Sequence, residues 1–277
     1  MKNFKGKVVV ITGAGSGIGR STALAFAREG ARLHIADIAK EKVEDVAREI
    51  TGMGAFARAY AVDCSDKNSM ARFADDVFRA EGRVDVLHNN AGVAFGGAVE
   101  KMPLEQWERI ISVNLWGPIY GMHFFVPRMI AQGGGGHVVN TSSVAGLMAF
   151  PTVSAYSTTK FALVGLSEVM NIELARHGIH TTALCPGFIN TPLVQATEMN
   201  IQDRKGRPVK DRIIRFYRDL GASPDRVAQD VLKAVRKKRP VQQSPWFHLG
   251  PVWILKRLSV RAYIQLMRAG NRLSGFR

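Results

Sequence analysis

The sequence predicts an α/β fold in which a doubly wound parallel sheet of six to seven strands carries helices on both faces. Two observations lead to this prediction. Short apolar segments alternate with segments of helical periodicity through most of the 277 residues, as they do in sheets built from strand–helix–strand units. The turn after the first apolar segment is rich in glycine and runs directly into a helical pattern. A basic helical extension is expected at the C-terminal end.

The predicted strands are short, apolar and rich in β-branched residues, which is typical of strands buried on both faces. They cover residues 8–12, 32–36, 57–62, 84–89, 137–142 and 181–185, with a weaker candidate at 240–243. Helical patterns cover residues 21–29, 40–50, 69–80, 104–130 (with a break near Asn114) and 155–176. A further helix begins at Ser223-Pro224, a favourable cap followed by proline, and ends within 236–240.

The first strand is followed by Thr12-Gly-Ala-Gly-Ser-Gly-Ile-Gly19 and then by a helix. Glycines let a backbone approach a pyrophosphate closely, and a helix N-terminus offers it free N–H groups and a partial positive charge. A glycine cluster between a strand and a helix therefore predicts a Rossmann-type dinucleotide site. Its candidate binding residues are Gly13, Gly15, Ser16, Gly17, Ile18 and Gly19.

The second strand leads to Asp37, eighteen residues after Gly19. This is close to the spacing of ~20 residues at which an acid binds an adenosine ribose. A carboxylate there accepts hydrogen bonds from both ribose hydroxyls and repels a 2′-phosphate. Ile38 follows where a phosphate site would need a basic residue. Arg20 is taken as the only cation near the expected site, and its position inside the first helix is equally compatible with a surface role. We therefore expect NAD as the cofactor, in preference to NADP.

Tyr156 and Lys160 lie one helical turn apart on one face of a predicted helix. An ammonium beside a phenol favours the phenolate and lowers the phenol pKa, which makes a base able to take a proton from an alcohol. Ser143 lies thirteen residues upstream of Tyr156, and Asn114 lies further upstream. Each of the four alone has a plain structural interpretation; their occurrence together in this order favours a catalytic site.

Together these residues resemble the short-chain dehydrogenase/reductase family from about residue 7 to residue 193. The motifs that carry the resemblance are Thr12-Gly-x-x-x-Gly-Ile-Gly19, Asp63, Asn89-Asn-Ala-Gly92, Asn114, Ser143, Tyr156-x-x-x-Lys160, and Pro186-Gly187 with Thr191. The family's usual interval to the tyrosine selects Ser143 over Ser142. The resemblance implies that Tyr156 is the base and that Lys160 holds the phenolate and contacts the nicotinamide ribose. It further implies that Ser143 donates to the substrate oxygen and that Asn114 holds a water linking Lys160 to solvent.

The resemblance also implies cofactor contacts at the ends of the later strands. Asp63 is expected to accept from the adenine amino group, with the Cys64 N–H opposite. The adenosine and the central strand are expected to be supported by Asn90, Ala91 and Gly92. The nicotinamide is expected to be covered by the segment 186–191, through Pro186, Gly187, Ile189 and Thr191.

The substrate pocket is expected to be almost wholly apolar. Its predicted lining is Phe95, Ala145, Met148, Phe150, Val153, Phe188 and Leu193. The absence of Arg and Lys from this set disfavours phosphorylated and carboxylate substrates, and favours a steroid-like, retinoid-like, terpenoid or aryl secondary alcohol or its ketone. Met and Phe are also ordinary core residues, so the prediction for each of these positions has a plain alternative.

The composition indicates which metals, cellular compartment and membrane segments to expect. The seven histidines show no metal-binding spacing, so no metal is expected. Cys64 and Cys185 are far apart in sequence, which favours a reduced, cytoplasmic protein. Because the given residues lead directly into the first strand, no signal peptide is expected, and no apolar stretch is long enough to predict a membrane span.

The net charge of +15 is unevenly distributed, because residues 203–277 carry +14 of it. We expect one domain at 1–245, with a lid at about 190–224, and a basic amphipathic extension at 246–277. A helix over 251–272 would place five polar residues in one stripe opposite a broad apolar face: Arg257, Arg261, Gln265, Arg268 and Arg272. Such a helix can lie peripherally in a membrane interface, or it can pack over the pocket or against a neighbouring subunit. Nucleic acid is not expected as a partner, because no base-reading module accompanies the charge.

The leading functional hypothesis is reversible, NAD-dependent oxidation of a hydrophobic secondary alcohol to the ketone. An NADPH-dependent ketone reductase is the alternative. A non-catalytic NAD-binding regulator is more remote, since a sensor has no need of a base. The helices at 155–176 and around 114–130 resemble those with which the family pairs its subunits, so a homodimer or homotetramer is expected.

Overall fold

The structure is a computed structural model that describes residues 1, 3–203, 205–245 and 250–274. Within these residues, seven parallel strands form one sheet in the order β3-β2-β1-β4-β6-β7-β9. The strands are β1 (Val8–Thr12), β2 (Arg32–Asp37), β3 (Phe56–Ala61), β4 (Val86–Asn89), β6 (Gly136–Thr141), β7 (Ile179–Pro186) and β9 (Val241–Ser244). The strand order reverses between β1 and β4, so the predicted doubly wound sheet is confirmed, including its weak last strand.

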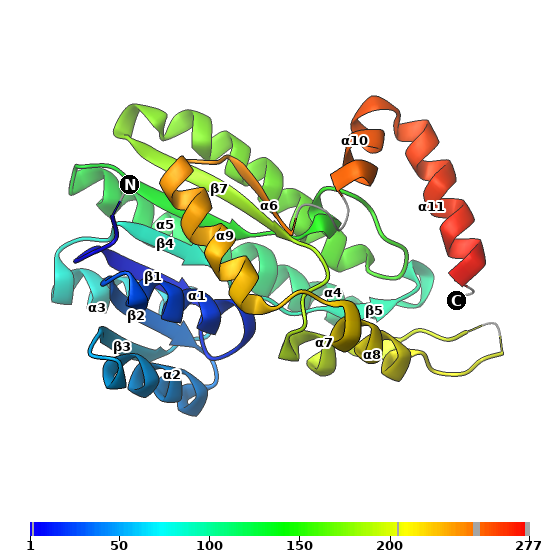
Figure 1. The fold of residues 1–277 in the computed structure, drawn as a ribbon, viewed down its shortest axis with the longest axis horizontal. Coiled ribbons are helices and arrows are strands. Elements are labelled where there is room, and N and C mark those ends of the chain that lie inside the picture. The colour runs from blue at the N-terminus through cyan, green and yellow to red at the C-terminus, as the bar shows by residue number, and fades with distance from the viewer. Residues whose placement is uncertain (2, 204, 246–249, 275–277) are drawn as a thin grey trace.

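Helices cover both faces of this sheet (Figure 1). One face carries α1 (Gly17–Arg28), α2 (Lys40–Gly52) and α9 (Pro224–Lys237), and the other carries α3 (Lys67–Glu81), α5 (Gly117–Ala131) and α6 (Ser154–Glu173). The two cores follow from side-chain alternation along the strands. In β1, Val9 and Ile11 belong to the first core, whereas Val8 and Val10 belong to the second.

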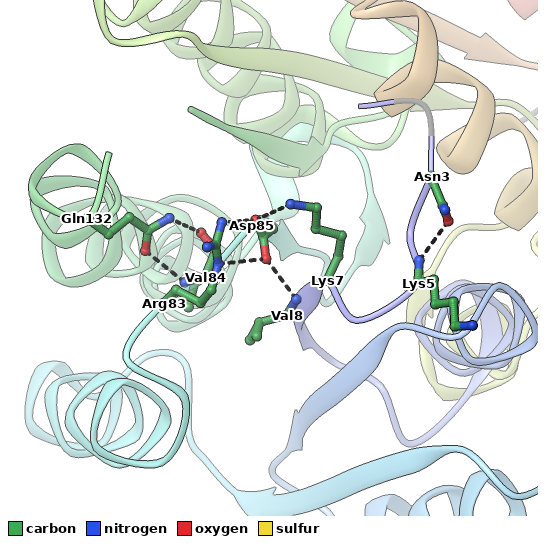
Figure 2. A network of polar contacts seen from close by, with 8 residues as sticks. All are labelled: Asn3, Lys5, Lys7, Val8, Arg83, Val84, Asp85 and Gln132. Atoms are coloured by element: carbon green, nitrogen blue, oxygen red, sulfur yellow. Dashed lines mark hydrogen bonds and ion pairs between the residues drawn. The ribbon is translucent and has the colours of Figure 1, made fainter. Parts of the chain in front are cut away.

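A polar network fixes the amino ends of the central strands, at the edge opposite the glycine turn (Figure 2). Asp85 accepts hydrogen bonds from the Val8 N–H at 3.0 Å and from Arg83 at 2.6 Å. Burial raises the pKa of Asp85, but these hydrogen bonds outweigh burial and hold the pKa below its ordinary value. The Gln132 side chain donates to the Val84 carbonyl at 2.7 Å and accepts from the Val84 N–H at 2.9 Å. The network joins β1, β4 and the end of α5, and its role is structural.

The predicted lid segment contains more regular structure than its charged sequence suggested. It holds α7 (Pro192–Ala196), the short strand β8 (Glu198–Asn200) and α8 (Lys210–Leu220). Strand β8 pairs in parallel with another short strand, β5 (Phe95–Gly97), and neither was predicted. Because β5 follows the end of β4, this pairing connects the segment 190–224 to the carboxyl edge of the main sheet.

Two predicted helices are each divided in the structure. The one at 104–130 becomes α4 (Leu104–Ile111), a π-helical turn (Ser112–Trp116) and α5, with Asn114 inside the turn as expected. The one at 251–272 becomes α10 (Gly250–Leu258) and α11 (Val260–Ser274). Ser259 lies between them, and its hydroxyl accepts from the Ala262 N–H at 3.2 Å, which caps the start of α11. Residues 246–249 and the side chain of Arg272 lie outside what the structure describes.

Candidate active site

A cavity of about 1130 Å³ opens at the carboxyl ends of the parallel strands. Its lining includes the glycine turn after β1, the residues that follow β2, β3, β4, β6 and β7, and the start of α6. Ligands of doubly wound sheets bind in this position, where the strand order reverses. Nearly all the residues singled out from the sequence therefore meet around one cavity, although they are spread over some 180 positions of the chain.

The glycine turn is held tightly against the loop after β4. Gly13 has a φ of +64°, and a Cβ there would lie 2.7 Å from the Cα of Ala91. A Cβ at Gly19 would lie 2.1 Å from the Gly13 carbonyl oxygen. The Asn90 amide donates to the carbonyls of Thr12 and Gly13 at 3.0 and 3.1 Å. Asn90 and Ala91 thus act by shaping the turn, and the glycines are required by close backbone packing.

The N-terminus of α1 opens into the cavity through Ser16, Gly17 and Ile18. The hydroxyl of Ser16, the N-cap residue, makes no capping hydrogen bond to this helix. The first N–H groups of a helix lack partners within it, and the helix dipole favours an anion at that end. Thr191 comes within 3.3 Å of the position that a Cβ at Gly17 would occupy, so the loop after β7 lies over the turn. This arrangement fits a dinucleotide pyrophosphate.

Asp37, at the end of β2, is oriented by two backbone groups. Its Oδ2 accepts from the Gly15 N–H and its Oδ1 from the Ala39 N–H, each at 2.9 Å. A carboxylate has about four lone-pair sites, so both oxygens can still accept further hydrogen bonds. Asp37 and Ile38 both line the cavity, as expected for residues that meet a ribose.

The nearby cation is not the one named from the sequence. Arg20 forms an exposed ion pair with Glu49 at 2.6 Å. Its charge is therefore compensated on the protein surface. Lys42, in the first turn of α2, lines the cavity together with Asp37. Lys42 was not predicted because it lies in the first turn of α2 and not directly beside the glycine turn or Asp37.

The residues after β3 form another part of the lining. The Asp63 Oδ1 accepts from the Ser65 N–H at 2.8 Å and from the Ser65 hydroxyl at 2.6 Å, which fixes the carboxylate. Cys64 is buried beside it, and burial raises the pKa of its thiol to about 12. The side chain of Cys64 is therefore a neutral thiol at physiological pH, and only its backbone is suited to a ligand contact.

Asn114 is a buried connector. Its side chain accepts from the Val93 N–H at 2.8 Å and donates to the Val93 carbonyl at 2.9 Å. It also lies 3.4 Å from the Thr159 hydroxyl on α6. A Cβ at Gly92 would meet the Asn114 Oδ1 at 3.3 Å and the Lys160 Nζ at 3.6 Å, so all three lie together. The π-helical turn brings Asn114 to this position, as such turns often do near functional sites.

Ser143, Tyr156 and Lys160 meet between the end of β6 and α6. The Ser143 side chain is near enough to the Tyr156 phenol to lower the phenol pKa. The Lys160 ammonium lies 5.4 Å from the centroid of the Tyr156 ring and donates to the Thr141 carbonyl at 2.8 Å. The competing Ser142 is engaged elsewhere, because its hydroxyl donates to the Lys160 carbonyl at 2.7 Å. Ser143 is thus the serine that faces the phenol.

The protonation states differ from the sequence-based expectation. Burial raises the pKa of Tyr156, and the nearby Ser143 side chain opposes this only in part. Burial also lowers the pKa of Lys160 from its ordinary 10.5 to about 8. The expected lowering of the phenol pKa by Lys160 is therefore not seen, because the ammonium is directed to the Thr141 carbonyl and desolvation dominates both groups.

Most of the predicted substrate-pocket residues line the cavity, and one does not. The six that do are Phe95, Ala145, Phe150, Val153, Phe188 and Leu193. Met148 is only 1% exposed and packs in a core cluster with Val144, Leu147 and Tyr263. Its prediction as a lining residue was wrong, because a methionine near a site can equally fill the core behind the wall. Two of the predicted cofactor residues, Gly15 and Gly19, do not line the cavity. They allow the close packing of the glycine turn against its neighbours.

Residues of α8 complete the wall and were not predicted. Phe188 packs edge-to-face on Phe216 and Tyr217, with ring centroids 5.2 and 5.6 Å apart. Both aromatic residues line the cavity, as do Arg109 and Arg212. In the sequence, the adjacent aromatic residues Phe216 and Tyr217 within an otherwise charged segment could have indicated that this helix contributes to the wall. The wall is mainly apolar, but two arginines correct the expectation that no basic residue would border it.

Comparisons with known proteins agree with this arrangement. A family model described as short chain dehydrogenase matches residues 7–202. The oxidoreductase EphD of Mycobacterium tuberculosis is 40% identical over 247 residues, which are 86% of this chain but only 41% of EphD. The oxidoreductase SadH of the same organism is 35% identical over 274 residues, 98% of this chain and 97% of SadH.

Among solved structures, a short-chain dehydrogenase/reductase from Burkholderia phymatum in complex with NAD aligns with a TM-score of 0.86 and 28% identity. The alignment covers 95% of this chain and 96% of that chain. The similarity therefore extends beyond the sheet to the C-terminal part of the molecule.

Proposed function

The chain belongs to the short-chain dehydrogenase family, and on that premise we propose that it catalyses the reversible, NAD-dependent oxidation of a hydrophobic secondary alcohol to the ketone. The observation that carries the proposal is the meeting of Ser143, Tyr156 and Lys160 on a mainly apolar cavity that also contains the glycine turn. In this proposal, the group that transfers the proton and the turn that binds the dinucleotide border the same cavity.

In this mechanism the protein handles the proton. Tyr156 takes the alcohol proton as the carbinol carbon loses its hydride, so that an O–H bond breaks and the carbonyl forms. Ser143 donates to the substrate oxygen and orients it. Lys160 and Asn114 lie together beside Gly92, and we propose that protons pass there toward solvent through bound water. NAD, when bound, supplies the hydride acceptor.

The raised pKa of Tyr156 predicts how direction depends on pH. A protonated phenol is suited to give a proton to a ketone, whereas oxidation needs the phenolate. Because burial holds the phenol protonated, we expect the rate of alcohol oxidation to increase as pH rises toward the Tyr156 pKa. Ketone reduction should be favoured at lower pH, and the two pH profiles should cross.

The residues present fit NAD. The open N-terminus of α1 suits the pyrophosphate, and Asp37 offers acceptor sites for two ribose hydroxyls while repelling a 2′-phosphate. The segment through Ile189 and Thr191 lies over the glycine turn, where it can cover a nicotinamide.

The cavity supports an apolar substrate. Its predicted wall residues are apolar, and α8 adds Phe216 and Tyr217. The Arg109 guanidinium pairs with Glu198 at 3.3 Å, so part of the basic charge near the cavity is already neutralised. We therefore infer a steroid-like, terpenoid or aryl alcohol in preference to a carboxylate substrate.

The test is turnover of secondary alcohols, from small aliphatic compounds to steroids, with NAD or NADP. Wild type should form reduced NAD, with kcat/KM rising with substrate apolarity. Tyr156→Phe should lower turnover by about 10²–10⁴-fold while calorimetry shows NAD binding retained. Binding of NAD without turnover of any substrate would favour the non-catalytic regulator instead.

An NADPH-dependent ketone reductase is the second candidate, and the position of Lys42 at the Asp37 end of the cavity favours it. Asp37→Ala separates the two. If NAD is the cofactor, this variant should lose NAD activity and gain NADP activity. If NADPH is the cofactor, wild type should already use it well, and Lys42→Met should weaken NADPH binding more than NADH binding.

A further inference from the structure

The last two helices form a hairpin with an inner and an outer surface. This C-terminal hairpin comprises α10 and α11 (residues 250–274) and lies at the outer edge of the molecule, toward the carboxyl end of the sheet (Figure 1). Its inner surface is fixed to the loop after β6. The Tyr263 hydroxyl donates to the Ala149 carbonyl and the Lys256 ammonium donates to the Leu147 carbonyl, each at 2.6 Å. Val252 and Met267 pack on the same cluster.

The outer surface of the hairpin leaves large apolar side chains uncovered. Leu258 is 80% exposed and Val260 is 57% exposed, on either side of the corner at Ser259. Three more apolar residues are between 41% and 48% exposed: Ile254, Ile264 and Leu266. Single exposed leucines are ordinary on protein surfaces. Leu258 and Val260, however, flank one corner, with Ile254 one turn before it and Ile264 one turn after it, and such a group marks an interaction site.

The charge of the same segment identifies the partner. The chain contains no Asp or Glu after Asp230, so the hairpin carries basic residues only. Arg257, Arg261 and Arg268 are all exposed beside the apolar group. A second copy docked hairpin to hairpin would bring arginines together with no carboxylate between them. An anionic surface with an apolar interior satisfies both features.

We propose that the C-terminal hairpin docks peripherally on an anionic lipid bilayer, with Leu258 and Val260 inserted at the headgroup level and the arginines on lipid phosphates. Within the described residues no helix is long and apolar enough to cross a membrane. Surface insertion of an amphipathic segment combined with basic residues is the mode that fits.

The hairpin also connects the lipid surface with the cavity. Phe150 lines the cavity and packs in the cluster that holds the hairpin. Docking would therefore place one wall of the cavity next to the membrane. An apolar alcohol dissolved in lipid would then have a short route to the site, although binding itself does not depend on the proposed redox function.

The test is co-sedimentation of the full chain with phosphatidylcholine vesicles, with and without phosphatidylglycerol. We expect binding to the anionic vesicles only, and release in high salt. Leu258→Glu with Val260→Glu should weaken binding at least about 10-fold. Arg261→Gln with Arg268→Gln should weaken it about 25-fold, or about 5-fold for each arginine.

Matched controls separate this surface from general effects. Leu104 is 74% exposed on α4, and Leu104→Glu should bind vesicles as wild type does. Arg72→Gln with Arg176→Gln removes two exposed charges far from the hairpin and should change binding little. Circular dichroism and NAD binding should be unchanged in all these variants, which shows that folding is retained.

Three results would overturn the proposal. They are equal binding to neutral and anionic vesicles, no binding to either, and retention of binding by Leu258→Glu with Val260→Glu. If those substitutions instead abolish a self-association seen without vesicles, the outer surface is an interface between copies of the chain.

Discussion

At the scale of single residues, Lys160 shows how the site departs from ordinary solution chemistry. It is 3% exposed, and burial lowers its pKa from 10.5 to about 8. A buried ammonium costs free energy of folding because the unfolded chain solvates that charge better. The residue most suited to hold a phenolate is thus also one that reduces the stability of the protein.

This cost predicts a pH-dependent stability difference. Below about pH 8 the lysine is protonated in both the folded and the unfolded chain, so the free-energy cost of burying the ammonium is fully present. Between pH 8 and 10.5 this cost disappears, because the folded protein releases the proton at a lower pH than the unfolded chain does. Lys160→Met should therefore raise the free energy of unfolding by on the order of 3 kcal/mol near neutral pH and change it little near pH 10.5. The same variant should lose turnover.

Urea unfolding across that pH range measures the effect. The exposed Lys233→Met in α9 is the matched control and should leave the stability profile unchanged. Parallel profiles for wild type and Lys160→Met at every pH would show that the buried ammonium carries no such penalty.

At the scale of elements, the π-helical turn at Ser112–Trp116 connects the sheet edge to α6. Its Asn114 satisfies both backbone groups of Val93, which follows β4, and reaches Thr159. The extra residue of a π-helical turn changes the direction in which Asn114 points relative to a regular α-helix. The irregularity is therefore what brings Asn114 beside Lys160.

Removing this connector should affect stability and catalysis together. Asn114→Ala removes the side-chain partners of the half-buried Val93 N–H and carbonyl. Because Val93 lines the cavity and is not fully buried, we expect a total cost of about 1–3 kcal/mol. Its kcat should fall while the KM for NAD stays near that of wild type, because Asn114 does not line the cavity. Thr158→Ala on α6, which is exposed and is not part of the cavity lining, loses a bond to the Ser154 carbonyl and should change both quantities little. An Asn114→Ala variant as stable and active as wild type would contradict this role.

The sequence predicts elements best where local pattern and packing agree. The bounds of β1 are those predicted, because an apolar β-branched run can only be buried in the sheet centre. Strands β5 and β8 were missed because each has three residues and because they pair across about a hundred positions of the chain. Two of the three residues of β5 are glycines, Gly96 and Gly97, which are unfavourable inside a strand. Met148 was misplaced for a related reason: sequence marks it as apolar but does not say on which side of the wall it lies. The glycine turn and the four proposed catalytic residues were predictable because chemistry fixes their spacing.

At the scale of the whole molecule, α6 carries an apolar stripe on its outer side. Phe161, Val169 and Ile172 are 36%, 50% and 78% exposed, and their spacing puts them on one face of the helix. Gly165 lies between them, and a Cβ there would meet nothing within 4 Å. The stripe therefore has an open, shallow centre where a second helix can approach closely.

We expect α6 of a second copy to pack against this stripe, which would give a homodimer or a homotetramer built from such pairs. A self-complementary patch on a symmetric pair repeats each contact twice, so one substitution acts at two places. Val169→Glu with Ile172→Glu should therefore reduce the mass measured by light scattering to that of a single chain. The hairpin touches one end of the stripe, because the Lys256 ammonium lies 4.3 Å from the centroid of the Phe161 ring. Leu258 is not part of the stripe, so Leu258→Glu should leave the mass unchanged. A wild type that is monomeric at all concentrations would exclude this assembly, and loss of association only in the hairpin variant would assign the interface to α10 and α11 instead.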